Sequence, residues 1–269
     1  MPTSDTWDRV VVDVREERPD PALLRDLVDG RAAVVVLRGL LREDEFTRNL
    51  ARVRELFGSA STTQYVNGTL TTIGPYLNKY LDDLDGYFQA AKESETMLAE
   101  ASFDLAARTR QELREQFGLQ SLEPAREPDG RQYAGSVVRI HADGVRNPLH
   151  NDNIMRDARN VDIVLRDLAY QLSCVVCLQE CTSGGELWMY RKPWEPTDEQ
   201  HKIPGHLGYD EQVVAGVPAH EFKPRTGDVY LINPTRYHAI ERVSGTDRLT
   251  MGFFIGFADD ALDSAVVWG

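Results

Sequence analysis

The sequence contains only three cysteines, Cys174, Cys177 and Cys181, and they lie within eight residues of one another. The apolar stretch around Cys174 and Cys177 indicates a buried strand, on which residues three apart point to opposite faces. A disulfide or a shared metal between these two cysteines is therefore disfavoured. We expect reduced cysteines in the core, as is usual for a cytoplasmic protein.

Positive charge is also scarce, because 30 Lys and Arg stand against 43 Asp and Glu, which gives a net charge of −13. This balance disfavours a nucleic acid or an anionic membrane as the partner and fits an acidic, solvated surface. No stretch reaches the roughly 18 apolar residues of a membrane span. The N-terminus lacks the basic and apolar segments of a secretory signal. The sequence therefore predicts a cytoplasmic protein.

Apolar residues recur at helical spacing in much of the first half of the chain, notably over 46–57 and 73–119. An apolar run at 32–39 indicates one buried strand, and 59–72 a loop or a weak strand. After a Pro-Asp-Gly turn at 128–130, short strand-like runs follow one another, several of them separated by turns that contain glycine. These runs are 133–141, 148–152, 169–179, 186–191, 220–223, 228–232, 238–243 and 249–257.

Eight short strands of this kind predict a double-sheet, cupin-like jelly roll. The expected organisation is one domain over residues 1–269, α+β in class and mainly β in its core. Residues 1–130 would form a mostly helical N-terminal layer with flanking helices. Residues 131–269 would form the jelly-roll core that carries the functional site.

Two histidines and one aspartate form the strongest candidate site. His150 and Asp152 occur in Pro-Leu-His-Asn-Asp-Asn, and side chains two apart on a strand leave the same face. His238 begins a later strand-like run. Two imidazoles and one carboxylate are the donor set of mononuclear non-haem Fe(II), which leaves further coordination positions open. H-x-D alone occurs often by chance, so the hypothesis depends on the ordered set that also includes an arginine.

That arginine is Arg248, which follows His238 in an apolar run. A buried guanidinium is costly without an anion, and it can bind a carboxylate through two parallel hydrogen bonds. Thr250 lies two residues on, on the same face of the strand, and offers a hydroxyl. The pair predicts a site for the distal end of a dicarboxylate whose 2-oxo acid end reaches the metal. A salt bridge to an internal Asp or Glu is the alternative.

The ordered set resembles the Fe(II)- and 2-oxoglutarate-dependent oxygenases, whose core is a double-stranded β-helix. The likeness extends to 167–173, 184–190, 227–228, 236–238 and 266–268. These segments look like the small-molecule branch that contains carrier-independent halogenases and the hydroxylases of free or N-acylated amino acids. The resemblance covers residues 130–269, and the N-terminal layer only in its general arrangement.

The resemblance implies that His150, Asp152 and His238 hold Fe(II), that Arg248 and Thr250 hold 2-oxoglutarate, and that O2 is the oxidant. The enzyme would abstract hydrogen from an aliphatic C–H of a small, amino-acid-like metabolite, with hydroxylation as the default outcome. Desaturation or ring closure, such as cyclopropane formation in natural-product biosynthesis, is an alternative outcome. The halogenases have Gly or Ala where this chain has Asp152, and chloride takes the vacated position, so halogenation is disfavoured here.

Candidates for the substrate side are Tyr65, Tyr133, Arg139, Asn153, Ser173 and Trp188. By the resemblance, Asn153 and Ser173 lie near the iron. Arg139 could pair with a substrate carboxylate, and Tyr65 lies in a polar loop that could form a lid. For each aromatic residue, plain core packing is the alternative.

Two other classes of protein share parts of this pattern. Two histidines and a carboxylate also suit catalytic zinc, so a zinc hydrolase is one alternative. A non-catalytic jelly-roll binding protein is the other. The position of Arg248 favours the oxygenase over the hydrolase, and the intact donor set favours it over the binding protein.

Overall fold

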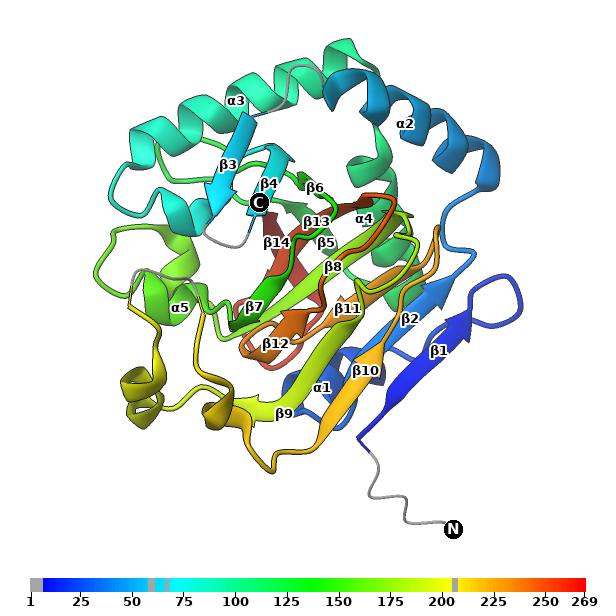
Figure 1. The fold of residues 1–269 in the computed structure, drawn as a ribbon. Coiled ribbons are helices and arrows are strands. Elements are labelled where there is room, and N and C mark those ends of the chain that lie inside the picture. The colour runs from blue at the N-terminus through cyan, green and yellow to red at the C-terminus, as the bar shows by residue number, and fades with distance from the viewer. Residues whose placement is uncertain (1–6, 58–60, 66–67, 205–207) are drawn as a thin grey trace.

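The computed structural model describes residues 7–57, 61–65, 68–204 and 208–269, with the side chains of 61–65 and 68–69 left aside. Its strands form a ten-stranded and a four-stranded sheet that face each other (Figure 1). The four-stranded sheet has the order β10-β9-β12-β7. The larger sheet runs β1-β2-β11-β8-β13-β6-β4-β3, and β14 pairs with both β13 and β5. This architecture is the predicted jelly roll.

The strands of the large sheet are β1 (Arg9–Asp13), β2 (Val34–Arg38), β3 (Ser61–Tyr65), β4 (Gly68–Ile73), β5 (Ser121–Pro124), β6 (Val137–His141), β8 (Tyr170–Gln179), β11 (Val229–Ile232), β13 (Arg248–Phe257) and β14 (Ser264–Trp268). Those of the small sheet are β7 (Asn147–His150), β9 (Leu187–Pro193), β10 (Ala219–Phe222) and β12 (Arg236–Ile240). Each of the eight predicted strand-like runs overlaps one of these strands.

The helices are α1 (Ala22–Asp29), α2 (Glu43–Leu56), α3 (Leu84–Glu100), α4 (Leu105–Phe117) and the short α5 (Ile154–Asp157). Single 3-10 turns occur at η2 (Leu77–Lys79), η3 (Val164–Asp167), η4 (Pro196–His201) and η5 (Glu211–Val214). Helices α1 and α4 end at Gly30 and Gly118, which adopt the left-handed conformation that closes a helix. None of the helices among the described residues is long and apolar enough to cross a membrane.

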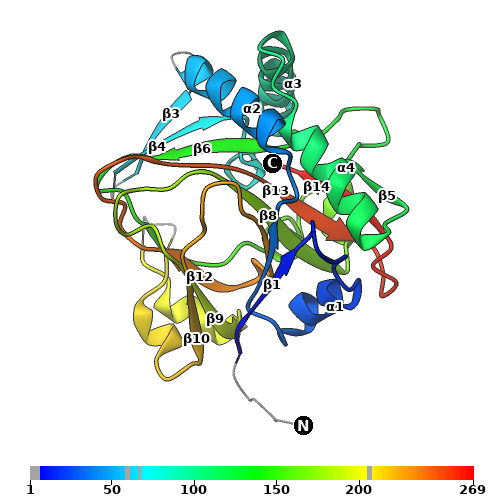
Figure 2. The same ribbon diagram turned by 90° about the vertical axis from the view of Figure 1, so that its right-hand side faces the viewer.

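The two faces of the large sheet bury different partners because side chains alternate along a strand. On the outer face, Leu172, Cys174 and Val176 of β8 belong to the core formed with α1, α2 and α4, and Figure 2 shows these helices on the side away from β9, β10 and β12. On the inner face, Tyr230 and Ile232 of β11 pack against the small sheet. The functional site lies between the two sheets, on this inner face.

The N-terminal part contributes more than the expected helical layer. Strands β1 to β5 all join the large sheet: β2 pairs with β11, β4 with β6, and β5 with the C-terminal β14. Residues before and after 130 therefore share one sheet. The pairing partners are distant in sequence, and local patterns do not reveal such partners. The three cysteines are unpaired and buried, as expected.

Candidate metal centre and co-substrate pocket

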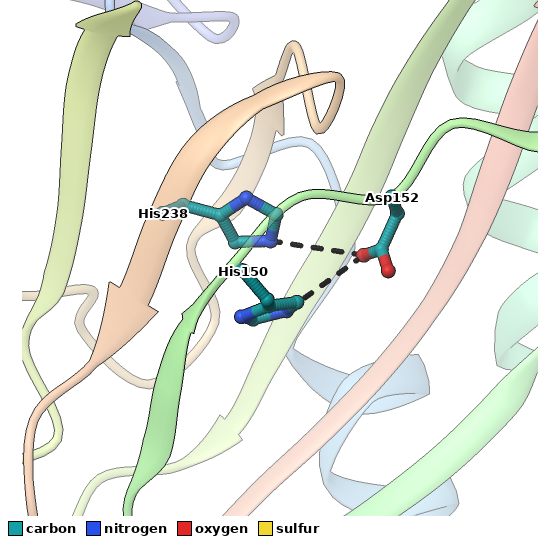
Figure 3. A group of neighbouring side chains, drawn as sticks. All are labelled: His150, Asp152 and His238. Atoms are coloured by element: carbon teal, nitrogen blue, oxygen red, sulfur yellow. Dashed lines mark ion pairs between the residues drawn. The ribbon is translucent and has the colours of Figure 1, made fainter. Parts of the chain in front are cut away.

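His150, Asp152 and His238 meet between the two sheets, with one ligand atom from each lying within 4.8 Å of the others (Figure 3). Oδ2 of Asp152 is 3.8 Å from Nε2 of His150 and 3.7 Å from Nε2 of His238. Two ligands that are each about 2.1 Å from one metal can be at most about 4.2 Å apart. Both distances are thus compatible with a single ion bound by all three side chains.

Pairing of β7 with β12 brings the two histidines together, because His150 and His238 are directly opposite each other in the register. The sequence suggested that the strand includes Asp152. In the structure it ends at His150, and Asp152 lies beyond it. Its backbone N–H donates to the carbonyl of Pro234 at 2.8 Å. This hydrogen bond turns the chain so that the carboxylate faces the two imidazoles.

Both imidazoles have their tautomer set by a backbone carbonyl. Nδ1 of His150 lies 2.7 Å from the carbonyl oxygen of Pro148, and Nδ1 of His238 lies 3.0 Å from that of Arg236. A carbonyl only accepts hydrogen bonds, so each Nδ1 must carry the proton. Each Nε2 therefore presents its lone pair toward Asp152, the arrangement that metal-binding histidines usually have.

The other oxygen of Asp152 is taken by Tyr76, whose hydroxyl donates to Oδ1 at 2.5 Å. Oδ2 alone then faces the two imidazoles, as in a carboxylate that binds a metal through one oxygen. Burial and the charge of Asp152 raise the pKa of Tyr76 well above its ordinary value, so the phenol keeps the proton it donates. The sequence analysis missed Tyr76, which comes from the segment before α3.

The protonation states of His238 and Asp152 favour the binding of a cation. Burial, and then the neighbouring His150, lower the pKa of His238 to about 4, so its imidazole is neutral near pH 7. Burial raises the pKa of Asp152, but the two imidazoles and the Tyr76 hydroxyl outweigh it and lower the pKa overall. Two imidazoles and one carboxylate match the donor preference of Fe(II).

A cavity of about 980 Å³ opens beside the three ligands, and Arg248 and Thr250 of β13 line its wall. Arg248 is only 3% exposed, and its Nη2 donates to the hydroxyl of Tyr230 at 3.0 Å. Among the described residues it forms no ion pair with an acidic side chain. The internal salt bridge considered as the alternative is thus not formed, and the guanidinium is left to bind an anion from the cavity.

His141 is a second residue that sequence analysis missed. It lies on the neighbouring β6, directly opposite Arg248, and lines the same cavity. Only 5% of its surface is exposed. Its Nδ1 is buried without a hydrogen-bond partner. Burial, then the charges of Arg248 and Arg139, lower the pKa of His141 well below its ordinary value, so this imidazole is neutral. Its alternation with Arg139 along the strand was the signal that could have revealed it.

The structure places some of the substrate-side candidates at the cavity and others away from it. Ser173 and Arg139 line the cavity. Tyr133 is fully buried in another part of the core, where its hydroxyl donates to Glu127. Asn153 caps α5 by accepting from the N–H of Arg156, and it does not line the cavity.

Trp188 lies on the face of β9 opposite Leu187, and it lines a small outer hollow instead of the metal cavity. Both faces of this strand carry apolar residues, so the sequence did not show which face turns inward. Tyr65 falls among the residues whose side chains lie outside the described part of the chain. Of the candidates, therefore, Ser173 and Arg139 are at the site.

Comparison with known proteins agrees with this geometry. The profile of one protein family, carrier-protein-independent halogenase WelO5, matches residues 7–269. Leucinostatins biosynthesis cluster protein S of Purpureocillium lilacinum is 26% identical over 212 residues, which are 74% of this chain and 79% of that protein. L-gamma-glutamyl-L-propargylglycine hydroxylase of Streptantibioticus cattleyicolor is 30% identical over 121 residues, which are 45% of this chain and 43% of that protein.

Among solved structures, an N-substituted L-amino acid dioxygenase of Burkholderia ambifaria in complex with α-ketoglutarate superimposes with a TM-score of 0.57. The two chains are 18% identical, and the match covers 92% of this chain and 90% of the other. At this identity the likeness establishes the shared fold.

Proposed function

The chain belongs to the family of the carrier-protein-independent halogenase WelO5 and is an Fe(II)- and 2-oxoglutarate-dependent oxygenase. From this premise we propose that it hydroxylates an aliphatic carbon of a small, amino-acid-like metabolite. The observation that carries the proposal is the carboxylate of Asp152 between the two histidines. The halogenases have Gly or Ala at this place and bind chloride there. With Asp152 present, the halide has no such position.

In this proposal His150, Asp152 and His238 hold the iron, and Tyr76 and the two backbone carbonyls hold those ligands in orientation. The iron, when bound, would supply O2 activation coupled to decarboxylation of 2-oxoglutarate to succinate and CO2, and hydrogen abstraction from the substrate. Arg248, Thr250 and His141 would hold the distal carboxylate. The cavity wall would position the target carbon and exclude water.

The proposal is tested by measuring succinate release across free amino acids and their N-acyl derivatives, with Fe(II), 2-oxoglutarate, O2 and chloride present. We expect at least one of these compounds to stimulate succinate formation and to gain one oxygen atom, as seen by mass spectrometry. A chlorinated product would contradict the assignment of hydroxylation. Absence of any stimulated succinate release would contradict the assigned substrate class.

Replacing Tyr76 with phenylalanine is expected to weaken iron binding, because Asp152 would lose the hydrogen bond that orients it. Loss of such a partner of a metal ligand typically lowers metal affinity by about 10- to 100-fold. Anaerobic titration with Fe(II) in the presence of 2-oxoglutarate measures this effect. Tyr80→Phe, a change on the same segment outside the hydrogen bond, is the matched control, and equal affinities of the two variants would contradict the role of Tyr76.

Replacing His141 with leucine is expected to raise the dissociation constant of 2-oxoglutarate by about 10-fold, because one hydrogen bond to a charged group contributes about 1.5 kcal/mol. Iron affinity should stay unchanged. His220→Leu, on β10 and outside the cavity, is the control. If His141→Leu binds 2-oxoglutarate as tightly as the wild type, the unpartnered nitrogen does not contact the co-substrate.

A further inference from the structure

Arg139 lies on β6 and reaches across the cavity face of the large sheet toward β13. Its guanidinium lies over Gly252, because a Cβ placed on that glycine would be 3.1 Å from Nη1 of Arg139. The same Cβ would be 3.0 Å from the backbone carbonyl oxygen of Cys174. Gly252 comes two residues after Thr250 and faces the same side of the strand. Because Gly252 has no side chain, the guanidinium of Arg139 has room at this position.

Three other cations of the cavity wall have ion-pair partners, whereas Arg248, assigned to the co-substrate, has none among the described residues. Arg156 lies 2.6 Å from Asp157, Arg146 lies 3.8 Å from Glu211, and Lys202 lies 3.8 Å from Glu199. Arg139, by contrast, has no hydrogen bond and no ion pair among the described residues, and its guanidinium carbon lies 6.0 Å from the centre of the Tyr76 ring. Arg139 is thus a partly buried cation that faces a cavity and has no ion-pair partner among the described residues.

The surroundings of Arg139 favour an anion from outside the protein. Burial, and then the charge of Arg139, lower the pKa of the nearby Lys79, so two cationic side chains share this part of the wall. The acid whose pKa Arg139 affects is Asp152, and that carboxylate is already engaged by Tyr76 and the two histidines. A partly buried guanidinium without a protein anion is costly, and a carboxylate is the group whose geometry it matches.

We infer that Arg139, placed over Gly252, is the site that binds a free carboxylate of the prime substrate. The substrate class is then a free carboxylic acid, such as an amino acid or an N-acyl amino acid, as opposed to its amide, its ester or a carrier-bound thioester. This inference rests on the proposed function. The guanidinium carbon of Arg139 lies 6.0 Å from the centre of the Tyr76 ring, and the hydroxyl of that ring donates to Asp152. A carboxylate held by Arg139 would therefore bring its neighbouring carbons toward the metal ligands.

The test uses the acid that releases most succinate in the assay above, together with its primary amide. Binding of each is measured anaerobically by the change it causes in the visible absorption of the protein with Fe(II) and 2-oxoglutarate. We expect wild-type protein to bind the acid at least about 100-fold more tightly than the amide, since two charge-assisted hydrogen bonds are at stake. In Arg139→Gln this preference should fall to within about 3-fold.

Gly252→Ala gives a second, independent variant, because it keeps the charge of Arg139 but crowds its Nη1 atom. The preference for the acid should fall in this variant too, while 2-oxoglutarate binds as in the wild type, which also reports correct folding. Arg166→Gln, which removes an exposed partner of Asp162, is the control and should leave both affinities unchanged.

Three results would overturn the inference. The first is equal binding of acid and amide by the wild type, and the second is an unchanged preference in Arg139→Gln. The third is a selective loss of 2-oxoglutarate affinity in Arg139→Gln, which would assign Arg139 to the 2-oxo acid end of the co-substrate. Failure of the proposed function is distinguishable, because no tested acid would then stimulate succinate release or gain one oxygen atom, whereas the inference concerns only the relative binding of acid and amide.

Discussion

Replacing Asp152 with alanine is expected to abolish hydroxylation. Removal of an outer partner of a metal ligand already lowers metal affinity or activity by about 10- to 100-fold, so the loss of the ligand itself should exceed about 100-fold. The reason is geometric: Oδ2 of Asp152 faces both imidazoles, and no other acidic side chain among the described residues belongs to this three-ligand cluster. The measurement is succinate and hydroxylated product formed per enzyme under saturating Fe(II).

The control for this variant is Asp162→Ala, which removes an exposed carboxylate that is paired with Arg166 and does not line the cavity. It should retain wild-type activity. An Asp152→Ala protein that folds and still hydroxylates at the wild-type rate would remove Asp152 from the site. Retained activity would also remove the physical basis for preferring hydroxylation over halogenation.

Replacing Arg248 with glutamine is expected to raise the Michaelis constant for 2-oxoglutarate by about 100-fold or more, because two hydrogen bonds to a carboxylate, each worth about 1.5–3 kcal/mol, are lost. The Michaelis constant for the prime substrate should change far less, since Arg248 is assigned to the co-substrate. Steady-state kinetics with each compound varied in turn separates the two effects.

Arg242→Gln, an exposed arginine that donates to the carbonyl of Gly144, is the matched control. A change confined to the prime substrate in Arg248→Gln would contradict the assignment of Arg248 to the co-substrate. Comparison with Arg139→Gln then tests the division of labour between the two arginines, one expected to bind the co-substrate and the other the substrate.

The parts of the site that the sequence could predict are those carried by alternation along a strand. His150, Asp152 and His238 stood out by residue type and spacing, and Arg248 and Thr250 by the contrast of a charge within an apolar run. The structure brings all five to one cavity. Short strand-like runs, several of them separated by turns that contain glycine, predicted the eight core strands, although Asp152 lies just past the end of its strand.

The sequence could not predict partners supplied by distant segments. Tyr76 lies within 73–119, where helical spacing predicted a helix, but the structure has it outside the helices, just before η2, and nothing local links it to Asp152. Trp188 was a candidate for the substrate side, but it lines a small outer hollow, and because its strand is apolar on both faces the sequence did not show which face turns inward. The position of the Arg139 guanidinium over Gly252 depends on the pairing of β6 with β13, which only the fold reveals.

Anaerobic titration of the metal-free protein with Fe(II) in the presence of 2-oxoglutarate tests the central claim most directly, namely that three side chains meet at one iron with a co-substrate beside it. We predict a weak visible charge-transfer band that saturates at one iron per chain and is absent from His238→Ala. A wild-type protein without this band, or a His238→Ala protein with the same band and stoichiometry, would contradict the account.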